Sequence, residues 1–153
     1  MDSLKVQILG VYKTSKGFMV ALESEAGGKI LPIFISEGQA QSIGLGLSEK
    51  EPSRPLTHDL LLQIIGGQDL TVESVTVDGL QKGTFTAELR LTRGDKAFPY
   101  DLRPSDAIAL AVRKDVDIYV SRDVMERAGK EKKDQVDDSR KLALKRFKKQ
   151  EEE

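Results

Sequence analysis

The chain has 153 residues, of which 39% are hydrophobic and 32% charged, with a formal net charge of −1. This length and composition predict a single domain with its own core, and the small net charge argues against a tight, nonspecific nucleic-acid binder. The absence of cysteine excludes disulfides, thiolate metal sites and a cysteine nucleophile, and the single histidine excludes a multi-histidine zinc site within one chain.

The beginning of the sequence alternates apolar and polar residues with the period of half-buried strands. With a turn at Gly27-Gly28, this pattern predicts three strands, over residues 4–12, 17–23 and 29–35. Pro32 lies within the third strand and has no N–H to donate, so it should face a sheet edge or mark a bulge.

A helix should follow the third strand. Ser36 and Gln39 have the spacing of a capping box, and apolar positions continue to Leu47. Gly44 and Gly46 weaken this helix. Because no strand–GxGxxG–helix order surrounds them, we expect these glycines to permit close helix packing rather than to bind phosphate.

The rest of the predicted domain repeats the order of strands and helices. Helices are predicted over 57–65, 105–113 and from Ser121 to Gly129, and strands over 70–77, 84–92, 96–102 and 117–120. Turns are expected at Asp78-Gly79 and at Arg93-Gly94-Asp95. The helix over 105–113 is apolar on nearly every side, which predicts that it is the central buried helix.

The order of elements predicts an α+β fold with two antiparallel three-strand meanders, each followed by helices, in one compact domain over residues 1–129. Residues 130–153 are predicted to form a charged, helical tail. One narrow helical stripe of this tail is apolar and should dock on a neighbouring surface or a second subunit; it comprises Val136, Ala143, Leu144 and Phe147.

We expect a cytoplasmic protein without a membrane partner. The N-terminal residues show no signal-peptide pattern, and no stretch approaches the roughly 20 apolar residues that cross a bilayer.

Two segments share an arginine before a proline, then a hydroxyl residue, then an aspartate, at the start of a predicted helix. They are Arg54-Pro55-Leu56-Thr57-His58-Asp59 and Asp101-Leu102-Arg103-Pro104-Ser105-Asp106. Helix N-termini present unpaired N–H groups and a positive dipole end, which suit anions. The structural interpretation is that Thr57 and Ser105 are ordinary N-caps and that the aspartates complement the helix dipoles.

These two segments, together with Leu31-Pro32-Ile33-Phe34-Ile35-Ser36-Glu37-Gly38-Gln39-Ala40, resemble the bifunctional nuclease domain family. The likeness spans about residues 4–129, with three motifs in the family's order. It implies a dimeric α+β domain, with nuclease activity on DNA and RNA attributed to the plant branch. The stretch from Asp134 to Glu153 lacks the UvrB/UvrC-type helical hairpin that ends some members.

Three functional hypotheses follow. The first is a metal-dependent phosphodiesterase that cleaves RNA, DNA or both, and whose binding of nucleic acid is weak and salt-sensitive. Its proposed catalytic residues are His58, Asp59, Asp101 and Asp106; the three aspartates would hold Mg²⁺ or Mn²⁺. Arg54, Arg103, Thr57 and Ser105 would bind the phosphate. Histidine suits proton transfer because its ordinary pKa lies near neutrality.

The second hypothesis is a non-enzymatic, dimeric module that binds an anionic metabolite or a partner's carboxylates. The third makes Arg54–Asp106 and Arg103–Asp59 structural ion pairs that lock the two halves of the domain together. The nuclease hypothesis requires the two helix starts to meet in the fold. Arg103 and Asp106 flank the most apolar helix, so we expect their charges to lie at the edge of the core.

Overall fold

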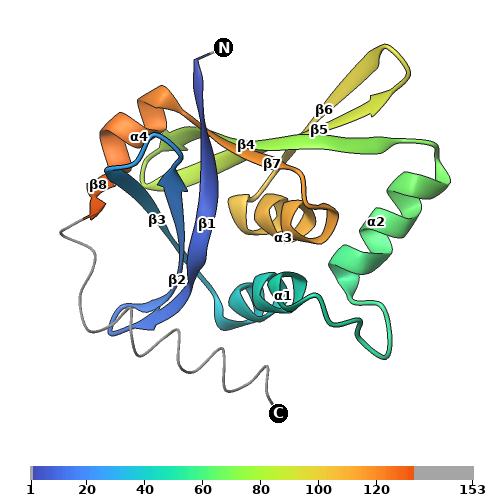
Figure 1. Cartoon of the computed structure of the whole chain (residues 1–153), viewed down its shortest axis with the longest axis horizontal. Helices are drawn as coiled ribbons and strands as arrows, with labels where there is room; N and C mark the ends of the chain where they lie inside the picture. The colour runs from blue at the N-terminus through green and yellow to red at the C-terminus, as the bar shows by residue number, and fades with distance from the viewer. Residues whose placement is uncertain (1, 133–153) are drawn as a thin grey trace.

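The computed structural model describes residues 2–132, and within them one sheet of eight strands is covered by helices (Figure 1). The strands are β1 (Ser3–Thr14), β2 (Gly17–Ser24), β3 (Lys29–Ile35), β4 (Thr71–Gln81), β5 (Thr84–Arg93), β6 (Lys96–Leu102), β7 (Asp117–Ser121) and β8 (Lys130–Glu131). The helices are α1 (Glu37–Ser48), α2 (Thr57–Gly67), α3 (Pro104–Lys114) and α4 (Arg122–Ala128). The predicted α+β class is confirmed. None of these helices is long and apolar enough to span a membrane.

Both predicted meanders are present, and β7 joins them into one sheet. The strand order is β6-β5-β4-β7-β1-β2-β3-β8, in which β7 runs antiparallel to β1 and parallel to β4. The two halves of the sequence therefore share a continuous sheet, and the helix that follows each meander packs on the same core.

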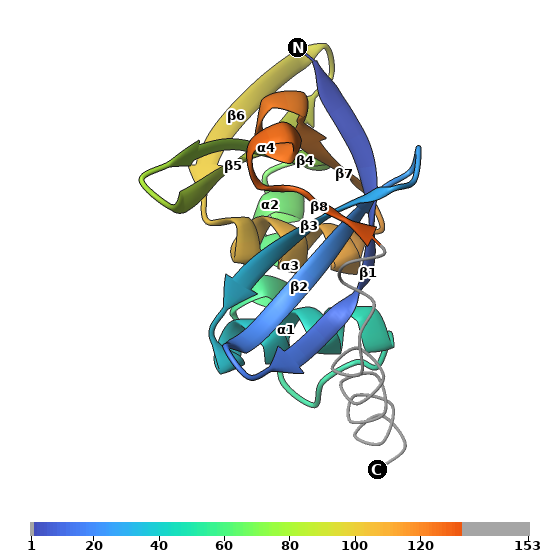
Figure 2. The same cartoon turned by 90° about the vertical axis from the view of Figure 1, so that its left-hand side faces the viewer.

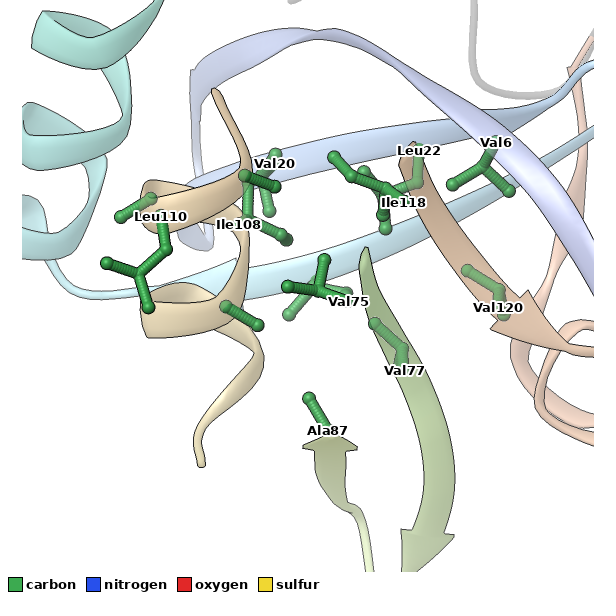
Figure 3. Packing of buried hydrophobic residues seen from close by; sticks show 14 of the residues in the cluster. Val6, Val20, Leu22, Val75, Val77, Ala87, Ile108, Leu110, Ile118 and Val120 are labelled. Atoms are coloured by element: carbon green, nitrogen blue, oxygen red, sulfur yellow. The ribbon is translucent and has the colours of Figure 1, made fainter. Parts of the chain in front are cut away.

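The core surrounds α3, as predicted. Residues 107–111 are at most 1% exposed, and their side chains belong to one cluster with strand residues of both meanders. Figure 3 shows Ile108 and Leu110 of α3 in this cluster with Val20 of β2 and Val75 of β4. A helix covered on all sides needs no polar face, which explains its sequence.

Local signals at the first meander and α1 are confirmed. The Ser36 hydroxyl accepts a hydrogen bond from the Gln39 backbone N–H, and the Gln39 side chain accepts one from the Ser36 backbone N–H. Pro32 pairs with Ala21 of β2, while β8 pairs only with Lys29 and Ile30 on the other side of β3. Pro32 thus lies where β3 has one neighbouring strand.

Three local predictions are wrong. The strand β4 continues through Asp78-Gly79 to Gln81, and the turn lies at Lys82-Gly83, whose φ angles of 52° and 79° suit a two-residue hairpin. Leu56 and Arg103, rather than Thr57 and Ser105, hold the N-cap positions of α2 and α3. Lys130 and Glu131, predicted to begin the helical tail, form β8; the rest of the predicted tail, from 133 on, lies outside the described residues.

Gly46 permits the close approach of α1 to α3. A Cβ atom at Gly46 would lie 2.5 Å from Val112 Cγ2 and 3.0 Å from Arg113 Nη1. We expect Gly46→Ala to lower the free energy of unfolding by about 1–3 kcal/mol, because the branched valine must move within a packed interface. Urea unfolding monitored by circular dichroism measures this change.

Gly66→Ala is the matched control, since Gly66 is also helical and a Cβ atom there would meet nothing within 4 Å. This substitution should leave stability unchanged or raise it by up to about 1 kcal/mol. Equal effects at the two glycines would contradict the packing role of Gly46.

Candidate functional site

The starts of α2 and α3 meet through a hydrogen bond between His58 and Asp106. His58 Nε2 lies 2.9 Å from Asp106 Oδ1. His58 is in the first turn of α2 and Asp106 in the first turn of α3. The side chains are 16% and 25% exposed, respectively. The condition that the two helix starts come together is therefore met.

Two residues that the sequence interpretation did not select extend this contact across α1 and α3. Ser42 of α1 places its Oγ 2.7 Å from His58 Nδ1. Arg113, near the end of α3, donates from Nη2 to Ser42 Oγ at 3.2 Å and from Nε to Asp59 Oδ1 at 3.0 Å. At the other end, Arg103 donates from Nε to Asp106 Oδ2 at 2.8 Å. We call these six residues, which are Ser42, His58, Asp59, Arg103, Asp106 and Arg113, the polar network.

The partners of His58 assign its neutral tautomer. A guanidinium can only donate, so Ser42 Oγ accepts from Arg113 and its own hydrogen is available for His58 Nδ1. His58 Nε2 then carries the ring proton and donates it to Asp106. If Nδ1 gains a proton, Ser42 Oγ can accept that hydrogen bond after its hydroxyl turns. The network can therefore hold the histidine in either protonation state.

Both carboxylates of the network are held in the charged form. Burial raises the pKa of Asp106, but hydrogen bonds from Arg103 and His58 and the charge of Arg103 outweigh this effect, so its pKa lies below the ordinary value. Burial likewise raises the pKa of Asp59, and hydrogen bonds from the Leu56 backbone N–H and from Arg113 bring it below the ordinary value. Both groups are thus acceptors at neutral pH.

The network contains two kinds of ion pair. The Arg113 side chain is 8% exposed and also donates from Nη1 to the Ala109 carbonyl at 2.8 Å, so its pair with the 25% exposed Asp59 is largely buried on the arginine side. The Arg103 side chain is 70% exposed and reaches Asp106 from the surface. The predicted pairs Arg54–Asp106 and Arg103–Asp59 are wrong, and so is the expectation that Arg103 lies at the edge of the core.

The other predicted site residues lie apart from the network. Asp101 is exposed on β6, where its partner in the strand register is Glu88 of β5. Arg54 is exposed in the connection between α1 and α2, and within residues 2–132 it makes no ion pair. Ser105 is 5% exposed, so it is not open to a phosphate, whereas Thr57 is exposed beside His58.

The three carboxylates predicted to bind a metal do not form a cluster. Asp59 is engaged by Arg113 and Leu56, Asp106 by His58 and Arg103, and Asp101 lies on a different element. Over residues 2–132, no group of three or more histidine or carboxylate side chains is arranged to hold a metal ion. The predicted donor set therefore does not fit Mg²⁺ or Mn²⁺ in this chain.

A cleft of about 700 Å³ lies between β1 and the C-terminal ends of α1 and α3. Asp59 and Arg113 form part of its wall, but His58 and Asp106 do not line it. Carboxylates outnumber basic side chains in the lining, with Glu49, Glu51 and Asp115 among them. An acidic cleft repels phosphate, so the exposed side of the network at Arg103 is the better position for an anion.

Comparison with known sequences identifies the family. The profile of the bifunctional nuclease domain matches residues 20–133. The chain belongs to the bifunctional nuclease domain family. All six residues of the polar network lie inside the range that matches this domain.

The relatives include bacterial and plant proteins. An uncharacterized protein of Mycobacterium tuberculosis is 36% identical over 129 residues, covering 84% of this chain and 77% of that protein. Bifunctional nuclease 2 of Arabidopsis thaliana is 32% identical over 107 residues, covering 67% of this chain and 32% of that protein. Bifunctional nuclease 2 of Oryza sativa is similar to the same degree, with 33% of its length covered. This chain therefore spans about a third of each of these plant relatives.

Ser42 and Arg113 were missed because each carries only a weak sequence signal. Ser42 is one small polar residue in a helix with a weakly amphipathic pattern, and Arg113 has the usual position of a basic residue in the last turn of a helix. An arginine directly after the apolar run 107–112 could have been recognised, because a charge so close to a buried helix needs a partner.

Proposed function

We propose that this chain is a nuclease that hydrolyses phosphodiester bonds in RNA, DNA or both. Membership of the bifunctional nuclease domain family supports the activity class, and plant relatives carry that name. The observation that carries the proposal is the His58–Asp106 hydrogen bond at the start of α3, beside an exposed arginine. A proton acceptor and a phosphate-binding cation thus lie at one helix start.

In this proposal Arg103 binds the phosphate. Its side chain is mostly exposed and holds Asp106 through a surface ion pair, so it can rotate towards an incoming anion at small cost. That rotation frees Asp106 Oδ2 and removes the Arg103 contact that lowers the pKa of this carboxyl. Oδ2 then accepts a proton from the water that attacks phosphorus, the bond from phosphorus to the leaving oxygen breaks, and solvent supplies a proton to that oxygen. His58 Nε2–H keeps Asp106 Oδ1 in place and stabilises the carboxylate. Thr57 is an additional phosphate contact because it is exposed beside His58.

Asp106 and His58 stay in the proposed site with roles that differ from the sequence prediction: Asp106 accepts a proton instead of binding a metal, and His58 orients Asp106 instead of transferring a proton. Asp59 has a positioning role. Its carboxylate binds Arg113, and Arg113 holds Ser42 against the histidine ring. A requirement for a divalent cation stays a prediction. The roles given above are those of the side chains, and no step is assigned to a metal, because the carboxylates do not form the predicted cluster.

The second candidate is a non-enzymatic module that binds an anion. It is favoured by the contacts already made inside the network: both nitrogens of His58 and both oxygens of Asp106 have partners. The single lone pair of His58 Nδ1 is taken by the Ser42 hydroxyl, so His58 must lose this hydrogen bond before it accepts a proton. In this alternative Arg103 binds the ligand and the remaining network holds α1, α2 and α3 together.

A nuclease assay separates the two candidates. We expect the purified chain to cleave single-stranded RNA or DNA with Mg²⁺ or Mn²⁺ present, and binding of either substrate to weaken steeply as salt rises. Gel assays with each metal and with EDTA measure cleavage, and fluorescence anisotropy measures binding. Cleavage that persists in EDTA contradicts the metal requirement. Salt-sensitive binding without cleavage in any metal contradicts the nuclease proposal and favours the binding module.

A further inference from the structure

The face of the first meander that points away from α1 and α3 is apolar, and we call it the outer face. In the strand register Tyr12, Met19 and Phe34 form one row across β1, β2 and β3, and Ala21 pairs with Pro32 in the next. Ile30 pairs with Glu23 at the far end. The apolar residues of the outer face are Leu9, Tyr12, Met19, Ala21, Ile30, Pro32 and Phe34.

This face is separate from the main core. Tyr12, Ala21 and Ile30 form a cluster of their own, against which Leu9 and Met19 pack. In Figure 2 β2 and β3 lie in front of α1 and α3, so these two helices cover the opposite face of the meander. Tyr12, Ala21 and Ile30 are each 3% exposed, so the exposed apolar part of this face is at Phe34 and the partly exposed Met19.

The exposure of Phe34 indicates room for a neighbour on the outer face. Phe34 is 53% exposed, although it lies next to Met19 in an otherwise apolar row.

The described part of the chain ends at the rim of this face. Lys132 Nζ lies 2.7 Å from Glu23 Oε2, and the Lys132 backbone N–H donates to the Gly28 carbonyl at 2.9 Å. Glu23 neighbours Ile30, the last apolar residue of the face. The chain therefore leaves the domain beside the outer face, with residues 133–153 still to follow.

The sequence of that segment matches the face in pattern and in length. As a helix, it places Val136, Ala143, Leu144 and Phe147 on one stripe. From Val136 to Phe147 such a helix extends about 16 Å at a rise of 1.5 Å per residue. The rows of Ile30 and Phe34 are about 13 Å apart at 3.3 Å per residue along the strand. One stripe thus spans the whole apolar face.

We propose that residues 133–153 fold back as an amphipathic helix whose apolar stripe docks on the outer face of the same chain. The interaction buries Phe34 and Met19 beneath Leu144 and Phe147, and the charged residues of the segment face solvent. The family domain ends at residue 133, so this docking helix is an addition to that domain. The proposal does not depend on the proposed nuclease function.

Cross-linking of the full chain tests this docking, because the natural sequence has no cysteine. Met19→Cys and Leu144→Cys are introduced together and treated with a short bismaleimide at low micromolar concentration. The control combines Met19→Cys with Lys145→Cys, which lies on the opposite side of the predicted helix. Denaturing gels and intact mass spectrometry distinguish an intrachain link from a link between two chains.

We expect an intrachain link in the first pair whose yield is at least fivefold above that of the control and is independent of protein concentration. Equal yields in both pairs overturn the proposal, because an undocked segment reacts without regard to its stripe. Links between chains that increase with concentration also overturn it, and assign the outer face to a second copy. The absence of a cross-link in both pairs also overturns the proposal.

Discussion

Replacing Arg113 by alanine should lower the free energy of unfolding by about 3 kcal/mol. The Arg113 side chain is 8% exposed and holds Asp59, Ser42 and the Ala109 carbonyl. Removing one partner of a buried ion pair costs about 3–5 kcal/mol, since the other charge is left without compensation. The lower end applies here, because the Asp59 side chain is 25% exposed. Thermal and urea unfolding measure the loss.

Two further variants isolate the cause. Arg103→Ala removes the exposed arginine of the same network and should melt close to the wild-type temperature. Adding Asp59→Asn to Arg113→Ala should recover part of the lost stability, because it removes the unpaired charge and an amide oxygen can still accept from the Leu56 N–H. If Arg113→Ala and Arg103→Ala melt at the same temperature, the Arg113–Asp59 pair does not stabilise the fold.

The fold was largely predictable because each element carries a local signal. Alternation marked β1, β2 and β3, the Ser36–Gln39 capping box marked α1, and the run 107–112 marked the buried helix. The position of β7 between β1 and β4 was not predictable from local signals, because strand neighbours depend on contacts distant in sequence. The Lys82-Gly83 turn was missed because Asp78-Gly79 has the same turn preference.

The site was predictable only in part, for a similar reason. The repeated arginine–proline pattern correctly directed attention to the two helix starts, and His58 and Asp106 do meet. Sequence proximity, however, made Asp101 and Arg54 look equivalent to Asp106 and Arg103. Asp101 belongs to a strand that ends before the helix start, and Arg54 to a loop. The partners came instead from distant parts of the sequence. Asp59 binds Arg113, which is 54 positions away, and His58 binds Ser42, which is 16 positions away.

The pairing of Asp59 with Arg113 changes what its substitution reports. The sequence interpretation made Asp59 a catalytic, metal-binding residue, for which Asp59→Asn would test the chemistry directly. The structure gives Asp59 two structural contacts, one to Arg113 and one to the Leu56 N–H. A loss of activity in this variant therefore cannot be separated from a loss of helix position without a melt. His58 is the more direct probe of the chemistry.

Replacing His58 by glutamine should lower kcat/KM for nucleic-acid cleavage by about 10²–10⁴-fold, the usual contribution of a group that assists proton transfer. Glutamine is polar and can keep one of the two hydrogen bonds of the ring, so the fold should be retained, which a melt verifies. Asp101→Asn is the matched control: it removes a predicted site carboxylate that lies apart on β6, and it should cleave at the wild-type rate. Binding of single-stranded RNA should persist in His58→Gln, because Arg103 is unchanged. Wild-type cleavage by a folded His58→Gln protein would remove the histidine from the chemistry and leave the network a structural role.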